Sequence, residues 1–237
     1  MIDFHSHILP GMDDGSPDAE TSLRMLRAAV RQGVTVQLLT PHFYPWKEEE
    51  TASFLRRRDR ALSELRELLP ETGMPLLLCA AEVAFFPGMS RAELGGLCAP
   101  GGLLLVELPF ESWDNRVREE LSTLSLDCGY RVLLAHVERY LGYAGNAEML
   151  DALLELPLCL QFNAGIFEKP GPERRRALRL LKRGVPFVLG TDAHNLTGRP
   201  PDLVVGRHAL ESRLGAAPLR EADALGRELL TGKRGAP

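Results

Sequence analysis

Short apolar runs alternate with segments of helical period along almost the whole chain. Apolar runs bounded by glycine, proline or polar residues are typical of buried strands, whereas apolar residues spaced three or four positions apart indicate amphipathic helices. Strands are predicted at Met1–His5, Val34–Thr40, Leu76–Glu82, Leu103–Leu108, Arg131–His136, Leu158–Asn163 and Pro186–Thr191.

The clearest helical pattern begins at Ser16, a residue type that often caps a helix N-terminus, with Pro17 at the first helical position. Leu23, Leu26 and Val30 form the apolar face of this helix. Further helices are predicted at Glu49–Leu69, Asn115–Asp127, Ala147–Leu156, Pro172–Arg183, Pro201–Leu214 and Leu219–Leu230.

The order of these elements predicts an α/β fold. Strand starts recur roughly every 30 residues, which is the spacing of βα units with parallel strands and right-handed crossovers. Such units build either an imperfect barrel or an open doubly wound sheet. No linker or low-complexity segment divides the sequence, so residues 1–237 are expected to form one domain.

Composition narrows the function classes. The chain is 45% hydrophobic and 25% charged, as in ordinary globular proteins, and its net charge of −4 disfavours nucleic acid as a partner. The four cysteines form no CxxC pair, so we expect reduced thiols in a cytoplasmic protein. No apolar run is long enough for membrane insertion.

Two pairs of ligand-type residues lie near the ends of the chain, His5 with His7 and Asp192 with His194. In a strand, the i, i+2 spacing places both side chains of a pair on one face, where Asp3 joins the first pair. Imidazole and carboxylate together suit Zn, Fe or Mn. Both pairs can bind the same metal only if the first and last strands meet, as they do in a closed barrel.

Other ligand-type residues also lie at strand ends. His42 follows the second predicted strand, whereas Glu82, Glu107 and His136 close the third, fourth and fifth. In a βα barrel the carboxyl ends of the strands form one face, where active sites lie. A lone histidine at a strand end is more often structural, so the prediction depends on five of the six histidines sharing this placement. His208, within a predicted helix, is interpreted as a surface or packing residue.

These segments resemble the PHP (polymerase and histidinol phosphatase) superfamily, from residue 2 to about residue 206. The similarity lies in HSHILPGMDDG (5–15), TPH (40–42), EV (82–83), VELP (106–109), AHVERY (135–140), NAG (163–165) and GTDAHN (190–195). Within the superfamily the chain most resembles the bacterial manganese-dependent protein-tyrosine phosphatases of capsule and exopolysaccharide synthesis. It departs from the usual pattern at Val137, where proline is common, and at Ala80-Ala81, where Gly-Gln is frequent.

The resemblance implies a distorted seven-stranded (β/α)7 TIM-like barrel, the PHP fold, that holds two to three ions of Mn²⁺, with Fe or Zn as alternatives. Arg139 and Arg199 match the arginines that hold the phosphoryl group. The implied ligands are His5, His7, Glu82 and Asp192 for one ion, Glu82, Glu107 and His136 for a second, and Asp14, His42 and His194 for a third.

The expected function is a metal-dependent protein-tyrosine phosphatase that uses metal-activated water on a phosphotyrosine protein, such as a bacterial tyrosine kinase of polysaccharide synthesis. A cysteine-based mechanism is excluded because no cysteine begins a Cys-x5-Arg sequence. Alternatives are a phosphatase for a small phosphomonoester of the histidinol phosphate type, a PHP nuclease or amidohydrolase-like hydrolase, and a non-catalytic metal-binding regulatory domain. The last is disfavoured because all nine ligand positions are retained.

Overall fold

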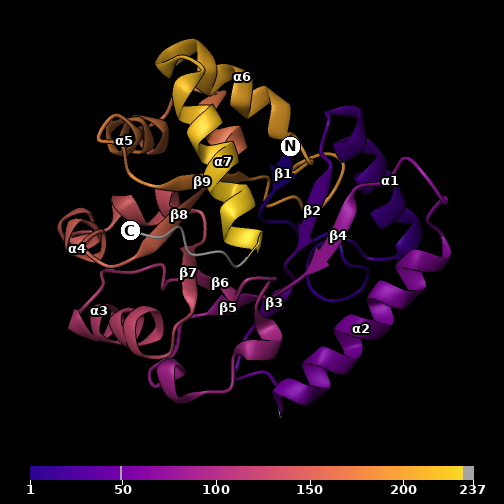
Figure 1. Cartoon of the computed structure of the whole chain (residues 1–237), viewed down its shortest axis with the longest axis horizontal. Helices are drawn as coiled ribbons and strands as arrows, with labels where there is room; N and C mark the ends of the chain where they lie inside the picture. The colour runs from indigo at the N-terminus through magenta and orange to yellow at the C-terminus, as the bar shows by residue number, and fades with distance from the viewer. Residues whose placement is uncertain (49, 232–237) are drawn as a thin grey trace.

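The computed structural model describes residues 1–48 and 50–231, and all pairing between its named strands is parallel. A three-stranded sheet has the order β1–β2–β4, and a six-stranded sheet has the order β3–β5–β6–β7–β8–β9 (Figure 1). The strands are β1 (Ile2–Asp3), β2 (Val36–Leu39), β3 (His42–Phe43), β4 (Leu76–Cys79), β5 (Glu82–Ala84), β6 (Leu103–Glu107), β7 (Arg131–Leu134), β8 (Leu158–Asn163) and β9 (Phe187–Gly190).

The predicted count of seven strands is not confirmed: the described residues form nine strands in two sheets, although each predicted run contains a strand. Nine strands arise because β3 begins after the end of the second predicted run and because the third run is interrupted before β5. Pro41 lies at the first break and has no amide hydrogen for a ladder. At the second break, the amide of Ala81 donates to the carbonyl of Leu97, at the end of a short 3-10 helix, at 2.8 Å instead of to a neighbouring strand.

The two sheets meet where the first and last strands end. The amide of Phe4 donates to the Leu189 carbonyl at 3.2 Å, and the amide of Asp192 donates to the His5 carbonyl at 2.8 Å. Asp3 strengthens this junction because its carboxylate accepts hydrogen bonds from the hydroxyl and amide of Thr191, at 2.7 and 2.8 Å. Residues from opposite ends of the sequence are thereby brought side by side.

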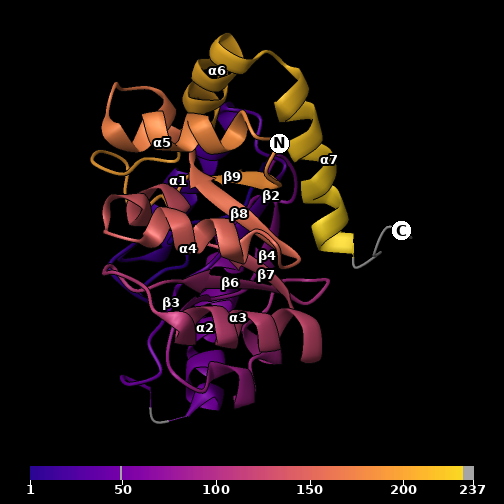
Figure 2. The ribbon, with the colours of Figure 1, turned by 90° about the vertical axis from the view of Figure 1, so that its left-hand side faces the viewer.

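Helices cover the outside of the strands, α1 and α2 beside the three-stranded sheet and α3, α4 and α5 beside the six-stranded sheet (Figures 1 and 2). Helix α7 lies apart from α3–α5, against the amino ends of β7–β9, where the Arg131 side chain donates to the Glu228 carbonyl at 2.9 Å. The bounds are α1 (Ala19–Arg31), α2 (Thr51–Glu67), α3 (Asn115–Ser122), α4 (Asn146–Leu153), α5 (Pro172–Leu181), α6 (Leu203–Leu214) and α7 (Ala217–Thr231).

Every predicted helical segment contains a helix, but several boundaries differ. Ser16 does not cap α1; Asp18 does, because its side chain accepts from the amide of Thr21 at 2.7 Å. Ser16 is buried instead, with its hydroxyl 2.8 Å from that of Ser22. The helix predicted at Asn115–Asp127 ends as α3 at Ser122, and its remaining residues form a π-helical turn. The first residue of the helix predicted at Glu49–Leu69 lies outside the described residues.

Alternate residues of the strands point to different apolar clusters, one inside the strands and two between the strands and the covering helices. Leu104 and Val106 of β6 face the helices, whereas Leu103 and Leu105 face inward. The inner cluster draws on both sheets and on α7, and comprises Phe4, Leu38, Ala80, Ala99, Leu103, Leu105, Leu133, Ala135, Cys159, Val188 and Leu229. The space between the two sheets is therefore filled by side chains, and polar residues gather beyond it at the carboxyl ends of the strands.

Candidate metal centre

The structure brings all nine predicted ligand residues together at the carboxyl ends of the strands. They form four overlapping sets whose donor atoms lie within 4.8 Å of one another. The sets are His7, Asp14, His42 and His194; His5, His7 and Asp192; His5, Glu82 and His136; and His42, Glu82 and Glu107. Asp3 is not among them, because it joins β1 to β9, and His208 is exposed on α6, as expected.

The tautomers of two buried histidines follow from their neighbours. His5 Nδ1 lies 3.0 Å from the Gln161 side-chain oxygen, and His7 Nδ1 lies 2.6 Å from an Asp13 oxygen. Both partners are acceptors, so each neutral imidazole carries its hydrogen on Nδ1. The two Nε2 atoms then present lone pairs to each other at 3.1 Å. Lone pairs this close repel unless a proton or a metal ion lies between them. Burial lowers the pKa values of His5 and His7, but the carboxylates around them outweigh burial and raise both values.

Glu82 provides the second indication of a cation site. Its Oε2 lies 3.3 Å from Nε2 of both His5 and His7, and it is fully buried without a hydrogen-bond partner. His42 Nδ1, which lies 2.8 Å from that oxygen without the geometry of a hydrogen bond, and His194 Nε2 are also buried atoms without such a partner. Since buried polar atoms are nearly always hydrogen-bonded, several unpaired acceptors in one group fit metal coordination.

The charges in this group shift the pKa values of its members. Burial raises the pKa of Glu82, but the facing imidazoles of His5, His136 and His42 outweigh burial and hold it well below its usual value. Burial and the nearby charge of Glu82 raise the pKa of Glu107 to about 7. Burial lowers the pKa of His136 to about 4, which keeps this imidazole in the neutral form that binds metals.

The backbone at two predicted ligands is unusual. Within the described chain, His136 at φ 30° and Asp192 at φ 54° are the only non-glycine residues with positive φ. The sequence placed them at the ends of strands, but β7 stops at Leu134 and β9 at Gly190, so both side chains project from sharp bends beyond the strands. Left-handed conformations of this kind carry a cost that surrounding structure must overcome, and they are frequent at functional sites.

Three polar residues that the sequence reasoning missed hold the ligands in place. Asp13 accepts a hydrogen bond from the His42 amide at 2.9 Å, in addition to its contact with His7. The Gln161 oxygen accepts from the His136 amide at 2.7 Å, and the Asn163 amide group donates to Asp192 at 3.0 Å. A glutamine within the otherwise apolar run LCLQFN was the available signal for Gln161.

Arg139 and Arg199 lie beside the ligand group without belonging to it. Their Nη2 atoms contact the same oxygen of Asp192, at 2.7 and 2.6 Å, and each side chain is 37% exposed. Both line an open cavity of about 360 Å³ that also includes Lys169. A phosphoryl group that entered from this cavity would meet two guanidinium groups, which donate planar pairs of hydrogen bonds to phosphate oxygens.

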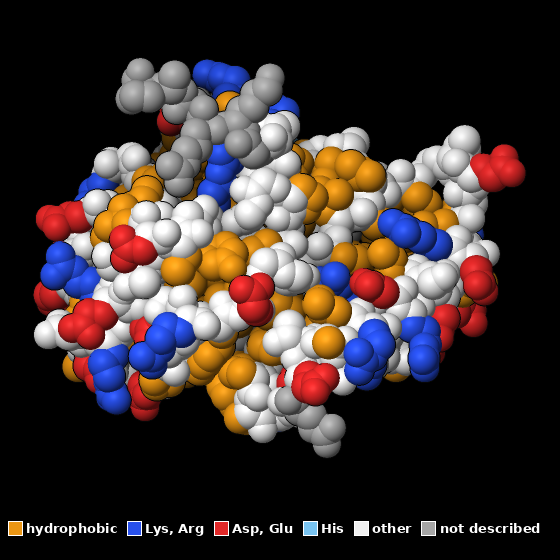
Figure 3. All heavy atoms as spheres, turned by 60° about the horizontal axis from the view of Figure 1, so that its bottom comes forward, with side chains coloured by type: hydrophobic (Ala, Val, Ile, Leu, Met, Phe, Trp, Pro, Cys, Tyr) orange, Lys and Arg blue, Asp and Glu red, His pale blue; other side chains and the backbone are white. Residues whose placement is uncertain are grey.

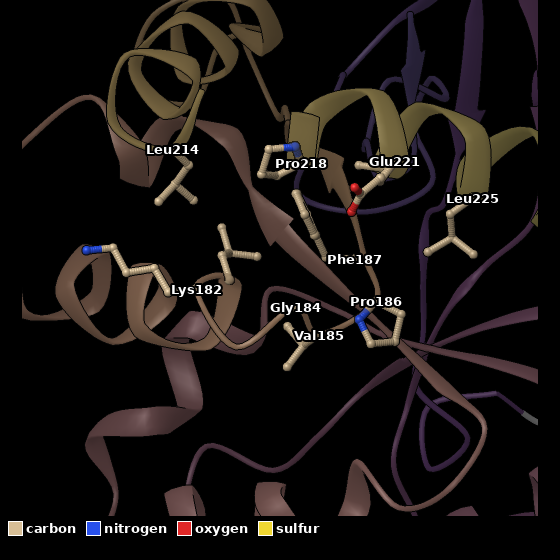
Figure 4. Close-up of a pocket in the computed structure, with 11 residues that line it drawn as sticks. Lys182, Gly184, Val185, Pro186, Phe187, Leu214, Pro218, Glu221 and Leu225 are labelled. Carbon is tan, nitrogen blue, oxygen red and sulfur yellow. The ribbon is translucent and has the colours of Figure 1, made fainter. Parts of the chain in front are cut away.

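Other features do not compete with this site. A cavity of about 470 Å³ lies at the opposite end of the strands, between α5, α7 and the start of β9 (Figure 4), and Lys182 and Glu221 are its only charged lining residues. On the face in Figure 3, Lys and Arg are interspersed with Asp and Glu and form no broad basic tract. None of the described helices has both the length and the apolar character needed to cross a bilayer.

Comparison with known proteins gives a consistent result. Residues 1–222 match the family described as capsular polysaccharide synthesis, CpsB/CapC. Over 225 residues, the sequence is 30% identical to the tyrosine-protein phosphatase YwqE of Bacillus subtilis. This alignment covers 91% of this chain and 86% of that protein. It is 27% identical over 238 residues to the tyrosine-protein phosphatase CpsB of Streptococcus pneumoniae, and this alignment covers 93% of this chain and 94% of that protein.

The fold is similar to a chain from the crystal structures of YwqE from Bacillus subtilis and CpsB from Streptococcus pneumoniae, described as unique metal-dependent tyrosine phosphatases. The TM-score is 0.86 at 26% sequence identity, and the match covers 99% of this chain and 96% of that chain. The fold that carries the candidate metal centre is therefore similar to that of a protein described as a metal-dependent tyrosine phosphatase. This chain belongs to the CpsB/CapC family.

Proposed function

We propose that the protein is a metal-dependent phosphatase that hydrolyses phosphotyrosine in proteins. The observation that carries this proposal is the single group of nine His, Asp and Glu residues with two arginines beside it. The names of the relatives YwqE and CpsB support the same activity. The expected protein substrate is a bacterial tyrosine kinase of polysaccharide synthesis.

The nine residues would hold two to three transition-metal ions, with Mn²⁺ favoured and Fe or Zn as alternatives. The unpaired buried atoms and the facing lone pairs of His5 and His7 support this assignment. Glu82 has close contacts to histidines on both sides, so it suits a bridging position. The proposed ligands are His5, His7, Asp14, His42, Glu82, Glu107, His136, Asp192 and His194.

Bound divalent ions supply Lewis-acid charge, which favours phosphate binding and the deprotonation of water near neutral pH. Arg139 and Arg199 bind the phosphoryl oxygens and stabilise the charge that develops on them during transfer. Asp192 orients both arginines through its contacts with their Nη2 atoms. Asp13 and Gln161 keep the hydrogens of His7 and His5 on Nδ1, which leaves Nε2 free to bind metal.

No thiol takes part in this mechanism. Burial raises the pKa of Cys79 to about 11 and the pKa values of Cys98 and Cys159 to about 12, so these side chains stay protonated at neutral pH. All four cysteines are unpaired, as expected for the reducing cytoplasm in which we place the protein.

We also infer that the two sheets together form one distorted seven-stranded barrel, in which β2 continues into β3 and β4 continues into β5 after a break. The barrel would belong to a single domain, residues 1–237, of which 49 and 232–237 lie outside the described residues. Support comes from the inner cluster shared by both sheets and from the hydrogen bonds between the ends of β1 and β9. This arrangement explains how the two ends of the sequence contribute to one site.

A side-by-side assay tests the proposed activity. The protein loaded with Mn²⁺ is given a phosphotyrosine peptide, histidinol phosphate and a nucleotide diester in parallel reactions. We expect the highest kcat/KM for the phosphotyrosine peptide. A higher value for histidinol phosphate would favour the small-metabolite phosphatase, and hydrolysis of the diester alone would favour a nuclease.

A further inference from the structure

Two large apolar side chains are exposed in loops that follow proposed metal ligands. Trp46, which is 65% exposed, lies four residues after His42, and Phe110, which is 45% exposed, lies three residues after Glu107. Single exposed apolar residues are common and need no explanation. Both lie at the end of the molecule that holds the candidate metal centre. Each belongs to a group of aromatic rings that contacts a proposed metal ligand.

Phe110 contacts the site directly. Its ring stacks on the imidazole of His136, with centroids 5.8 Å apart and planes at 22°. It also lies 5.2 Å from the ring of buried Tyr140, whose hydroxyl accepts a hydrogen bond from the Leu108 amide at 3.0 Å. Phe110 is therefore held in place by packing on one side while nearly half of it remains open to solvent.

Trp46 contacts the site through Tyr44. The Tyr44 ring stacks on the imidazole of His42, with ring centroids 5.0 Å apart and planes at 24°. The Nζ atom of Lys47 lies 4.4 Å from the centroid of the Tyr44 ring. The Trp46 ring lies 5.4 Å from Tyr44. Tyr44 is thus packed between its neighbours, whereas Trp46 stands at the outer edge of this stack.

The two ring systems flank one carboxylate. Glu82 lies 2.8 Å from His42 Nδ1 and 2.8 Å from His136 Nε2. Tyr44 stacks on the first imidazole and Phe110 on the second. A phosphoryl group held by metal ions at Glu82 would therefore lie near both ring systems.

We propose that Trp46 and Phe110 form an aryl-binding wall that selects phosphate esters of aromatic alcohols over those of alkyl alcohols. This inference rests on the proposed phosphatase function and adds the basis of its substrate choice. Metal ions and arginines recognise the phosphoryl group, which every phosphomonoester shares, so discrimination must come from contacts outside it. Phosphotyrosine places its ring between phosphate and backbone, where aromatic side chains can pack against it. Tyr44 acts as a positioning residue behind Trp46.

Binding of two phosphonates tests the wall without turnover. Calorimetry on the Mn²⁺-loaded protein compares phenylphosphonate, which carries a ring, with methylphosphonate, which does not. We expect the wild-type protein to bind phenylphosphonate more tightly by roughly 10-fold or more, the scale of discrimination by an apolar pocket. Phe110→Ala and Trp46→Ala should each lose much of this preference while the affinity for methylphosphonate stays within about twofold. Phe110→Tyr should restore it.

The matched control is Leu126→Ala, which removes an apolar side chain that is 58% exposed in the turn after α3. This variant should keep the full preference for phenylphosphonate. Equal binding of the two phosphonates by the wild-type protein would overturn the proposal, as would parallel losses for both phosphonates in Phe110→Ala. If the preference for phenylphosphonate is present but phosphotyrosine is not hydrolysed, the proposed function fails and the aryl-binding wall stands.

Discussion

Replacing Asp13 by asparagine should weaken metal binding while the fold stays intact. In the structure, one carboxylate oxygen of Asp13 contacts His7 Nδ1 at 2.6 Å and the His42 amide at 2.9 Å, and the other accepts from the Gly15 amide at 2.9 Å. Asparagine keeps a single oxygen, so its NH₂ group must face at least one of these N–H donors. If the asparagine oxygen takes the place of the shared oxygen, only the Gly15 contact is lost, and in the other orientation His7 and His42 both lose their acceptor. Either way the negative charge beside His7 is removed.

The expected loss is roughly 10- to 100-fold in metal affinity, the usual effect of removing a hydrogen-bond partner of a metal ligand. This corresponds to about 1.4–2.7 kcal/mol of binding free energy. Burial raises the pKa of Asp13, but the hydrogen bond and charge of His7 lower it to about 2. Asp13 is therefore ionised throughout the neutral range, and the variant removes a full negative charge from beside His7.

Isothermal titration of the metal-free protein with Mn²⁺ measures this effect. Asp18→Asn is the matched control, because Asp18 is an aspartate of the same segment that caps α1 on the surface and contacts no proposed ligand. The control should lower the melting temperature slightly and leave Mn²⁺ affinity unchanged. The reasoning is refuted if Asp13→Asn binds Mn²⁺ within about twofold of the wild-type protein, or if both variants lose affinity equally.

Three further predictions address the arginines, the thiols and the packing. Arg139→Ala should keep its metal content but lower kcat/KM for phosphotyrosine by roughly 10²–10³-fold, as measured by steady-state kinetics with metal occupancy confirmed. Arg139→Lys should recover only part of the lost kcat/KM. A rate for Arg139→Ala near that of the wild type would show that Arg139 only pairs with Asp192. Replacing all four cysteines by serine should leave kcat within about threefold in a variant that still folds, because the mechanism uses no thiolate; loss of activity at unchanged thermal stability and metal content would revive a covalent route. Gly206→Ala should destabilise the protein by about 1–3 kcal/mol in urea unfolding, because its methyl group would overlap the Ala164 carbonyl, whereas Gly95→Ala has no neighbour within 4 Å and should change stability little; equal effects would contradict this account of the α6 contact.

Most of the strands and eight of the nine proposed ligands could be located from local patterns in the sequence, whereas Asp14 was added by the family resemblance. Apolar runs bounded by polar residues located every strand except β3, and the carboxyl-end rule placed His5 and Asp192 in one site although 187 positions separate them. These features follow from the alternation of side chains and from parallel pairing, which the order of elements already implies.

The remaining features depend on tertiary contacts that the sequence does not display. The break before β5 follows from the carbonyl of Leu97, which ends a short 3-10 helix 16 residues further along the chain. The left-handed backbone at His136 and Asp192 is set by the neighbours that hold these residues, and propensity gives no sign of it. Asp13 was overlooked beside Asp14, since two adjacent aspartates can be assigned to ligand and supporting roles only when their directions are known.

Metal content measured together with activity tests the central claim most directly. Elemental analysis of the purified protein should find two to three transition-metal ions per chain. Treatment with EDTA should abolish phosphotyrosine hydrolysis, and added Mn²⁺ should restore it. Protein that contains no stoichiometric metal and keeps its phosphatase activity in EDTA would contradict the account.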